Sequence, residues 1–123
     1  MPVFTRLKDD ALVLTVDGDF TPNEIRRVAF GAFEDPKTPQ PVPVLLDMSG
    51  AAGLSAKSDE EMAATGAIFG AYRDRITALA VVAAADVHGH FAADGSFARE
   101  AGLSLQACNS HAEAREWLGV ANG

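Results

Sequence analysis

The sequence predicts an α/β fold: a single mixed, mostly parallel five-stranded sheet with about four helices, in the order β-β-α-β-α-β-α-β-α. Three observations lead to this prediction. The chain has 123 residues, which is the length of one ordinary domain, and 48% of them are hydrophobic. Segments with apolar residues at the period of two alternate with segments at helical spacing. Strands that alternate with helices favour a largely parallel sheet, here with a hairpin strand at one edge.

The chain begins with a predicted hairpin, formed by strands at residues 3–8 and 11–17. In the second strand, apolar residues recur with the period of two. Asp9 and Asp10 separate the two segments, and aspartate tolerates the backbone conformations of a tight turn. We therefore expect two antiparallel strands joined by a short turn.

The first helix is predicted over residues 22–33. Thr21 suits the N-cap position, Pro22 suits the first helical position, and Glu24 can close a capping box with Thr21. The following segment carries four prolines and is expected to be a connector without helix; these are Pro36, Pro39, Pro41 and Pro43.

The middle of the chain predicts two buried strands with a helix between them. Residues 44–47 are apolar on both faces up to Asp47, as in a central strand, and a loop is expected over residues 49–57. Ser58 opens a second capping box, and the helix it starts is expected to end near Arg73 and Arg75. Residues 76–83 are the next buried strand.

The last third predicts a helix, a strand and a final helix. Residues 86–101 favour a helix, although two glycines weaken that interpretation, and residues 103–108 alternate as a strand does. Ser110 and Glu113 form a third capping box for a helix whose buried stripe includes Trp117 and Leu118. We expect one domain over residues 1–118 and a flexible tail at residues 119–123.

Composition and charge exclude several classes of function. The net charge is −7, which disfavours nucleic acid and anionic lipid as partners. The longest strongly apolar run, residues 76–85, is half of the roughly 20 residues that a bilayer span needs. The first residues lack the pattern of a secretory signal, and a single cysteine permits no internal disulfide. These features are typical of a cytoplasmic protein without a membrane span.

The order of the first elements and three segments resemble a known family. The order β-β-α-β, followed by Val-Leu-Leu-Asp-Met-Ser-Gly at residues 44–50, resembles the third-strand signature of STAS domains, which include anti-sigma factor antagonists and modules of sulfate transporters. Arg-Ile-Thr-Ala-Leu-Ala-Val-Val at residues 75–82 and the ending at Trp117 and Leu118 look more specifically like the SpoIIAA-like branch. That branch consists mostly of small standalone proteins without assigned activity. The resemblance implies a STAS-like fold and a non-enzymatic regulatory or protein-interaction role.

The resemblance also exposes a departure from the family pattern. In phosphorylatable members, an Asp-Ser-Ser-Gly motif follows the strand, and its serine accepts phosphate from a partner kinase. The matching stretch of this chain is Ser55-Ala56-Lys57-Ser58, which places Ala56 where the phosphorylated serine stands. Because Ala56 has no hydroxyl, the family's phosphorylation switch is not expected at this position, and Ser58 is already explained as an N-cap.

A candidate ligand site is expected where two parallel strands end. The segments after Asp47 and after Ala83 should emerge together at the carboxyl edge of the sheet, where open α/β sheets bind ligands. A simpler alternative is that the glycines there only turn the chain. The acidic start of the second helix, at residues 59–61, disfavours a phosphate ligand. The candidate ligand-binding residues are Asp47, Ser49, Gly50, Ser55, Lys57, Ser58, Asp86 and His88.

Two further chemistries are considered and not favoured. Asp86, His88 and His90 have side chains that could ligate zinc or iron, but polar residues in a loop explain them more simply. Cys108 and His111 could form a nucleophile and base, but they fall where a strand becomes a helix. We therefore predict no catalytic residues, no metal and no cofactor.

The favoured hypothesis is a non-enzymatic STAS-like module that binds a partner protein. A homodimer is also expected, because the central strands are apolar on both faces, and helices covering only one face would leave the other open. The alternative hypothesis is a small-molecule or lipid carrier with an apolar pocket walled by Phe69, Phe91, Phe97 and Ile68. An enzyme built on Asp47, Asp86 and His88 comes third, since the sequence offers Asp47 no partner.

Overall fold

Five strands form one sheet in the order in which they occur along the chain. The computed structural model describes residues 3–8, 10–51, 59–83 and 104–119. The first two strands pair antiparallel, and every other neighbouring pair is parallel. This confirms the predicted mixed, mostly parallel sheet. The strands are β1 (Val3–Lys8), β2 (Ala11–Gly18), β3 (Val42–Ala51), β4 (Ile76–Val82) and β5 (Leu105–Cys108).

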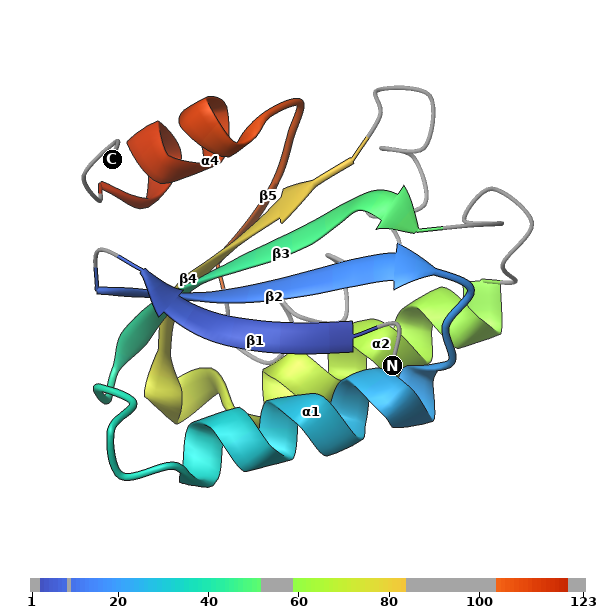
Figure 1. Cartoon of the computed structure of the whole chain (residues 1–123), viewed down its shortest axis with the longest axis horizontal. Helices are drawn as coiled ribbons and strands as arrows, with labels where there is room; N and C mark the ends of the chain where they lie inside the picture. The colour runs from blue at the N-terminus through green and yellow to red at the C-terminus, as the bar shows by residue number, and fades with distance from the viewer. Residues whose placement is uncertain (1–2, 9, 52–58, 84–103, 120–123) are drawn as a thin grey trace.

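Helices lie on both faces of this sheet (Figure 1). Helices α1 (Pro22–Glu34) and α2 (Asp59–Ala71) run along one face, and α4 (His111–Leu118) crosses the opposite face. A short 3-10 turn, η2 (Arg73–Arg75), leads into β4. The helix expected at residues 86–101 lies outside the described residues. The α/β architecture is therefore as predicted.

Two hydrophobic clusters, one on each face, hold the layers together. Alternation along the strands sends successive side chains to opposite faces. The larger cluster lies between the sheet and helices α1 and α2, and includes Leu14, Leu46 and Phe69. The smaller one lies under α4 and includes Val13, Leu45 and Ala114. The homodimer was expected on the assumption that the helices cover only one face of the sheet. That assumption is wrong, because α4 covers part of the second face.

The hairpin and the first helix follow their local signals. Lys8 pairs with Ala11, which leaves a two-residue turn, and Asp10 takes a left-handed backbone conformation with φ of 66°. Both halves of the first capping box form: Glu24 N–H donates to the Thr21 side chain, and the Thr21 N–H donates to the Glu24 carboxylate.

Side chains from outside α1 satisfy its carboxyl end. Thr38 Oγ1 donates to the carbonyl oxygen of Ala32 at 2.7 Å, and Gln40 Nε2 donates to that of Phe33 at 3.0 Å. Arg75 Nη1 also donates to the Phe33 carbonyl, and it forms an ion pair with Glu34 at 2.7 Å. The last turn of α1 has no basic residue of its own, so Arg75 supplies the positive charge that suits this helix end.

Strand β3 extends further than the sequence indicated. The predicted strand ended at Asp47 and was followed by a loop, but β3 continues to Ala51. Gly50 and Ala51 pair with Asp17 and Gly18 of β2 after a bulge, and this pairing overrides the turn character of Ser49 and Gly50. Asp47 therefore lies within the sheet and not at its edge.

Two further details differ from the sequence prediction. Helix α2 ends at Ala71, and Arg73 and Arg75 belong to the separate turn η2 and not to its last turn. Trp117 was expected to be buried with Leu118, but its residue surface is 39% exposed, and Leu118 alone packs against the smaller cluster. In the part of the chain that the structure describes, no helix has the length and apolar character needed to cross a bilayer.

Candidate functional site

Hydrogen-bond register places three chemically useful side chains in one row across the sheet. Phe4 of β1 pairs with Thr15 of β2, and Thr15 pairs with Asp47 of β3. The same row continues through Val82 and Cys108. Val82 and Cys108 belong to the cluster beneath α4, so the whole row faces that side of the sheet.

The start of α4 brings His111 to this row. Ser110 is the N-cap of α4, and its hydroxyl accepts the Glu113 N–H at 3.2 Å. The Glu113 carboxylate accepts the N–H of Asn109 and not that of Ser110, so this cap differs from the reciprocal box that was predicted. His111 is consequently the first helical residue, and its Nε2 lies 2.6 Å from Asp47 Oδ2.

Asp47 is held by three donors. Its Oδ1 accepts the Ser49 hydroxyl at 2.6 Å and the Ser49 N–H at 2.9 Å, while Oδ2 faces His111. Burial by itself raises the pKa of Asp47, but the hydrogen bonds from Ser49 and His111 outweigh it and hold the pKa below its usual value. An ionised carboxylate only accepts hydrogen bonds, so Nε2 carries the proton and Nδ1 is the remaining nitrogen of the His111 ring.

A cavity of about 520 Å³ opens beside this pair. It is lined by Phe4, Thr5, Arg6, Thr15, Asp47 and His111. The side chain of Asp47 is 13% exposed and that of His111 is 40% exposed. The cavity therefore presents an imidazole, hydroxyl groups, a guanidinium and an aromatic ring. We call it the β1–β3 cavity.

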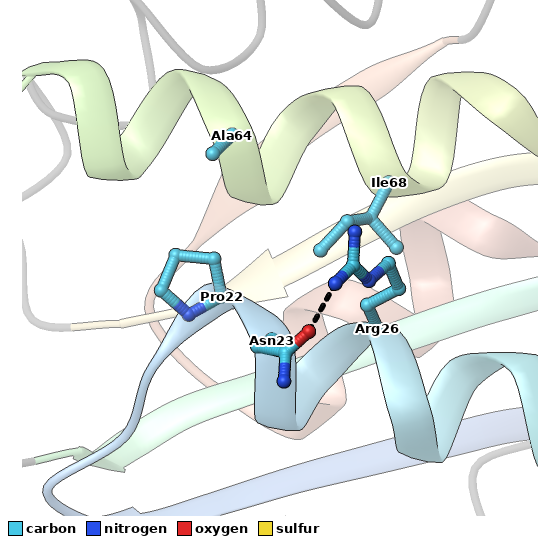
Figure 2. Close-up of a pocket in the computed structure, with 5 residues that line it drawn as sticks. All are labelled: Pro22, Asn23, Arg26, Ala64 and Ile68. Carbon is cyan, nitrogen blue, oxygen red and sulfur yellow. Dashed lines mark hydrogen bonds between the residues drawn. The ribbon is translucent and has the colours of Figure 1, made fainter.

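A second hollow lies on the other side of the sheet, between α1 and α2 (Figure 2). One part, of about 340 Å³, is lined by Pro22, Asn23, Arg26, Ala64 and Ile68. Figure 2 shows Pro22, Asn23 and Arg26 on α1 and Ala64 and Ile68 on α2, with the Arg26 side chain donating to the Asn23 side-chain oxygen. Apolar side chains and one guanidinium thus share this part of the surface.

The adjoining part of about 430 Å³ shares Asn23 and Arg26 and adds Arg27, Phe30 and Tyr72. We call the two parts together the α1–α2 groove. Phe30 is 58% exposed, the largest exposed fraction among the described large hydrophobic residues. Tyr72 stacks on Phe33, with ring centroids 4.6 Å apart, and Arg75 lies over the Tyr72 ring. The floor of the groove is therefore fixed, while Phe30 stands in solvent.

The predicted ligand site is only partly within the described residues. Asp47, Ser49 and Gly50 lie together in β3, and a Cβ added to Gly50 would stand 3.0 Å from Asp17 Oδ1. Gly50 therefore lies in a strand and not in a turn, beside the exposed side chain of Asp17. The other candidates, Ser55, Lys57, Ser58, Asp86 and His88, lie outside the described residues.

Sequence reasoning missed the pairing of Asp47 with His111. It considered His111 only as a base for Cys108, but the structure directs His111 Nε2 to Asp47. Cys108 is fully buried, and burial together with the charge of Glu113 raises the pKa of its thiol, the opposite of what a nucleophilic cysteine needs. The two residues of the pair are 64 positions apart, so no local signal connects them.

The residues proposed for metal and lipid binding are mostly not described. His90, like Asp86 and His88, lies outside the described residues, and so do Phe91 and Phe97. Among the residues that are described, no three side chains of metal-ligating type gather in one place. Phe69 belongs to the packed core, and Ile68 borders the shallow α1–α2 groove.

Comparison with known proteins supports the fold. No protein-family model matches the chain, and a search of curated proteins finds no significant match. A search of solved structures finds an uncharacterized DUF3478-family protein from Shewanella loihica PV-4, described as having a SpoIIAA-like fold. The two chains agree with a TM-score of 0.58 at 14% identity, over 94% of this chain and 91% of that chain. This chain therefore has a SpoIIAA-like fold, as its sequence resemblance indicated.

Proposed function

We propose that this chain is a non-enzymatic STAS-like regulatory module that binds a partner protein through the α1–α2 groove. The observation that supports this proposal is the position of Phe30, an exposed aromatic residue on the wall of a groove that also carries Arg26 and Arg27. Aromatic residues and arginine are the residue types most enriched at the energetic centres of protein interfaces. In this proposal, residues 1–118 act as one domain.

Charge indicates the chemistry of the partner. The chain carries a net charge of −7, yet the described residues that line the groove include two arginines and no acidic residue. Arg27 has no hydrogen bond or ion pair with any described residue, and Arg26 bonds only to the Asn23 side chain. Among the described residues, neither guanidinium group is paired with a carboxylate, so both suit a partner that supplies one. The expected partner therefore contributes an acidic segment with an apolar side chain that packs on Phe30.

The test is affinity capture from the native host, followed by cross-linking. Wild-type protein is compared with the double variant Arg26→Glu/Arg27→Glu and with Phe30→Ala. Lys8→Glu/Lys37→Glu is the matched control, because it makes the same change in net charge away from the groove. The expected result is a partner that the wild type and the control capture, that both groove variants lose, and that cross-links to α1 through an acidic peptide.

Three outcomes would contradict the proposal. Capture that is equal for all four proteins would show that the groove is not used. Cross-links confined to α4 or β5 would place the interface on the other side of the sheet. A basic cross-linked peptide would contradict the inferred chemistry of the partner.

A further inference from the structure

The β1–β3 cavity has a charge arrangement that the protein-binding proposal does not use. Asp47 is already compensated, since three donors occupy its two oxygens and its side chain is only 13% exposed. Arg6, on the opposite wall, is exposed and makes no hydrogen bond or ion pair with any described residue. The charge left free in the cavity is therefore positive.

The same wall offers a hydrophobic surface. Phe4 is 52% exposed and lies two residues before Arg6, so both side chains project from the same face of β1. Thr15, the register partner of Phe4, stands between the aromatic ring and Asp47. His111 lies at the far side, with its Nε2 committed to Asp47 and its Nδ1 left for another partner.

We infer that the β1–β3 cavity is a binding site for a small organic anion with a planar or aromatic body. Arg6 pairs with the carboxylate or phosphate of the ligand, and the Phe4 ring packs against its body. At the inner end, the Thr15 hydroxyl offers a donor or an acceptor, and His111 Nδ1 accepts a hydrogen bond from a donor group of the ligand, because Nε2 carries the ring proton. Asp47 acts as a positioning residue, because it holds the imidazole and does not itself face the anion. A cavity of about 520 Å³ is of the size that small-molecule sites have.

The chemistry of the cavity separates this ligand from others. A cation would meet the guanidinium of Arg6, which has no partner in the described part of the chain, and would find the carboxylate of Asp47 already occupied. A long lipid chain would need an apolar enclosure, whereas every residue that lines the cavity except Phe4 carries a polar or charged side chain. A compact anion with one flat apolar face can pair with Arg6 and pack on Phe4 at the same time.

The test is a titration of the ¹⁵N-labelled full chain with small anions, in which two-dimensional NMR monitors binding through the amide resonances. The probes are sodium benzoate and phenyl phosphate, with benzamide as the neutral counterpart of benzoate and inorganic phosphate as an anion without the ring. We expect saturable shifts at residues 4–6, 15, 47 and 111 with one or both aromatic anions. We expect much weaker binding of benzamide and of inorganic phosphate.

Matched variants test the role of Arg6. Arg6→Gln removes the guanidinium and should weaken binding about tenfold, because a charge-assisted contact is lost. Lys8→Gln removes a positive charge from the same face of the same strand, outside the cavity lining, and should change the affinity less than about twofold. Both residues are at the surface, and well-dispersed amide spectra verify that the variants fold.

Several results would overturn the inference. No saturable shift with either aromatic anion would remove the site. Equal affinity in wild type and Arg6→Gln would show that the anion is not held by Arg6, and equal affinity for inorganic phosphate would show that the Phe4 ring makes no contribution. Shifts confined to Arg26, Arg27 and their neighbours would place the anion in the α1–α2 groove. None of these results bears on capture of a protein partner, so the two proposals fail independently.

Discussion

Asp47 shows how one side chain couples three parts of the fold. It projects from the central strand β3, is anchored by Ser49 two residues along, and reaches His111 at the start of α4. Each contact involves a charged acceptor, and such hydrogen bonds are stronger than neutral ones. The same contacts lower the pKa of Asp47, so they also make the stability of the protein depend on pH.

Replacing Asp47 with asparagine should destabilise the protein in a pH-dependent way. The pKa of Asp47 is lower in the folded chain than the ordinary aspartate value of 3.8 that applies in the unfolded chain. The carboxylate therefore contributes its full stabilisation above that value and loses it as the pH falls through the lower folded pKa. Asp47→Asn should lower the free energy of unfolding by about 1–3 kcal/mol at neutral pH.

Urea denaturation of wild type and variant at neutral pH and at about pH 3 measures this effect, and the difference between the two proteins should shrink at the acidic pH. Asp17→Asn is the control, because Asp17 lies exposed on the neighbouring strand without a hydrogen bond to any described residue. A pH-independent loss of stability in Asp47→Asn would show that packing, and not charge, is responsible.

At the level of elements, the two ends of helix α1 are stabilised in different ways: nearby residues cap the amino end, and residues outside the helix bond to the carboxyl end. Its amino end is closed by residues within one turn of each other, Thr21 and Glu24. Its carboxyl end depends on Thr38, Gln40 and Arg75, and Arg75 is 41 residues from its ion-pair partner Glu34. The amino end is therefore predictable from the sequence, while the carboxyl end is not.

The capping box of α1 gives a test at this scale. Thr21→Ala removes the hydroxyl that accepts the Glu24 N–H and should lower the free energy of unfolding by about 1 kcal/mol. Thr21→Ser keeps an oxygen in the same place and should be close to wild type. Thermal or urea denaturation of the three proteins checks both expectations, and equal losses in both variants would show that the methyl group matters instead of the hydroxyl.

At the scale of the whole molecule, the sheet separates two cores of unequal size. The larger core, under α1 and α2, takes one set of alternate residues from the strands, and the smaller core, under α4, takes the other set. Leu46 belongs to the larger core and Leu45, its neighbour, to the smaller one. Both apolar faces of a central strand such as β3 are thus buried within one chain. The homodimer stays a prediction, without support from an uncovered face.

Core packing predicts a large difference between two leucines. Leu46 is 1% exposed at the centre of the larger core, whereas Leu7 on the edge strand β1 is 43% exposed. Leu46→Ala should lower the free energy of unfolding by about 3 kcal/mol, because it removes buried apolar atoms and leaves a cavity. The same substitution at Leu7 should lower it by less than about 1 kcal/mol. Chemical denaturation measures both, and similar losses would contradict the assignment of the core.

Local signals explain which parts of the fold were predictable. The first capping box, the turn preference of Asp10 and the alternation of β2 are short-range patterns, and all three correspond to features of the described residues. The predicted end of β3 at Asp47 was wrong, since the strand continues to Ala51. Pairing with β2 outweighs the turn preference of Ser49 and Gly50. The predicted burial of Trp117 was wrong, because Ala114 and Leu118 form the face of α4 that packs on the sheet, and Trp117 lies about 100° around the helix from Leu118.

The candidate site likewise combines residues that local signals indicate with residues that only tertiary structure brings together. Asp47 was singled out from its place after an apolar run, and Ser49 from its place in the loop expected after that strand. His111 was assigned to Cys108 because sequence proximity was the only guide, and Arg6 and Phe4 drew no attention, since an exposed arginine and an exposed phenylalanine on a strand are ordinary. Only the register of β1, β2 and β3 places Phe4, Thr15 and Asp47 in one row.

The sequence alone indicated the class of fold, the order of the elements that the structure describes and the start of the first helix. These follow from periodicity, capping residues and composition, which act over a few residues at a time. Tertiary structure decided which side chains meet: His111 contacts Asp47, and Arg75 contacts the end of α1. It also places Arg26 and Ile68 along the same groove. These contacts join residues more than 40 positions apart, and their geometry exists only once strand pairing and helix packing have set the distances between elements.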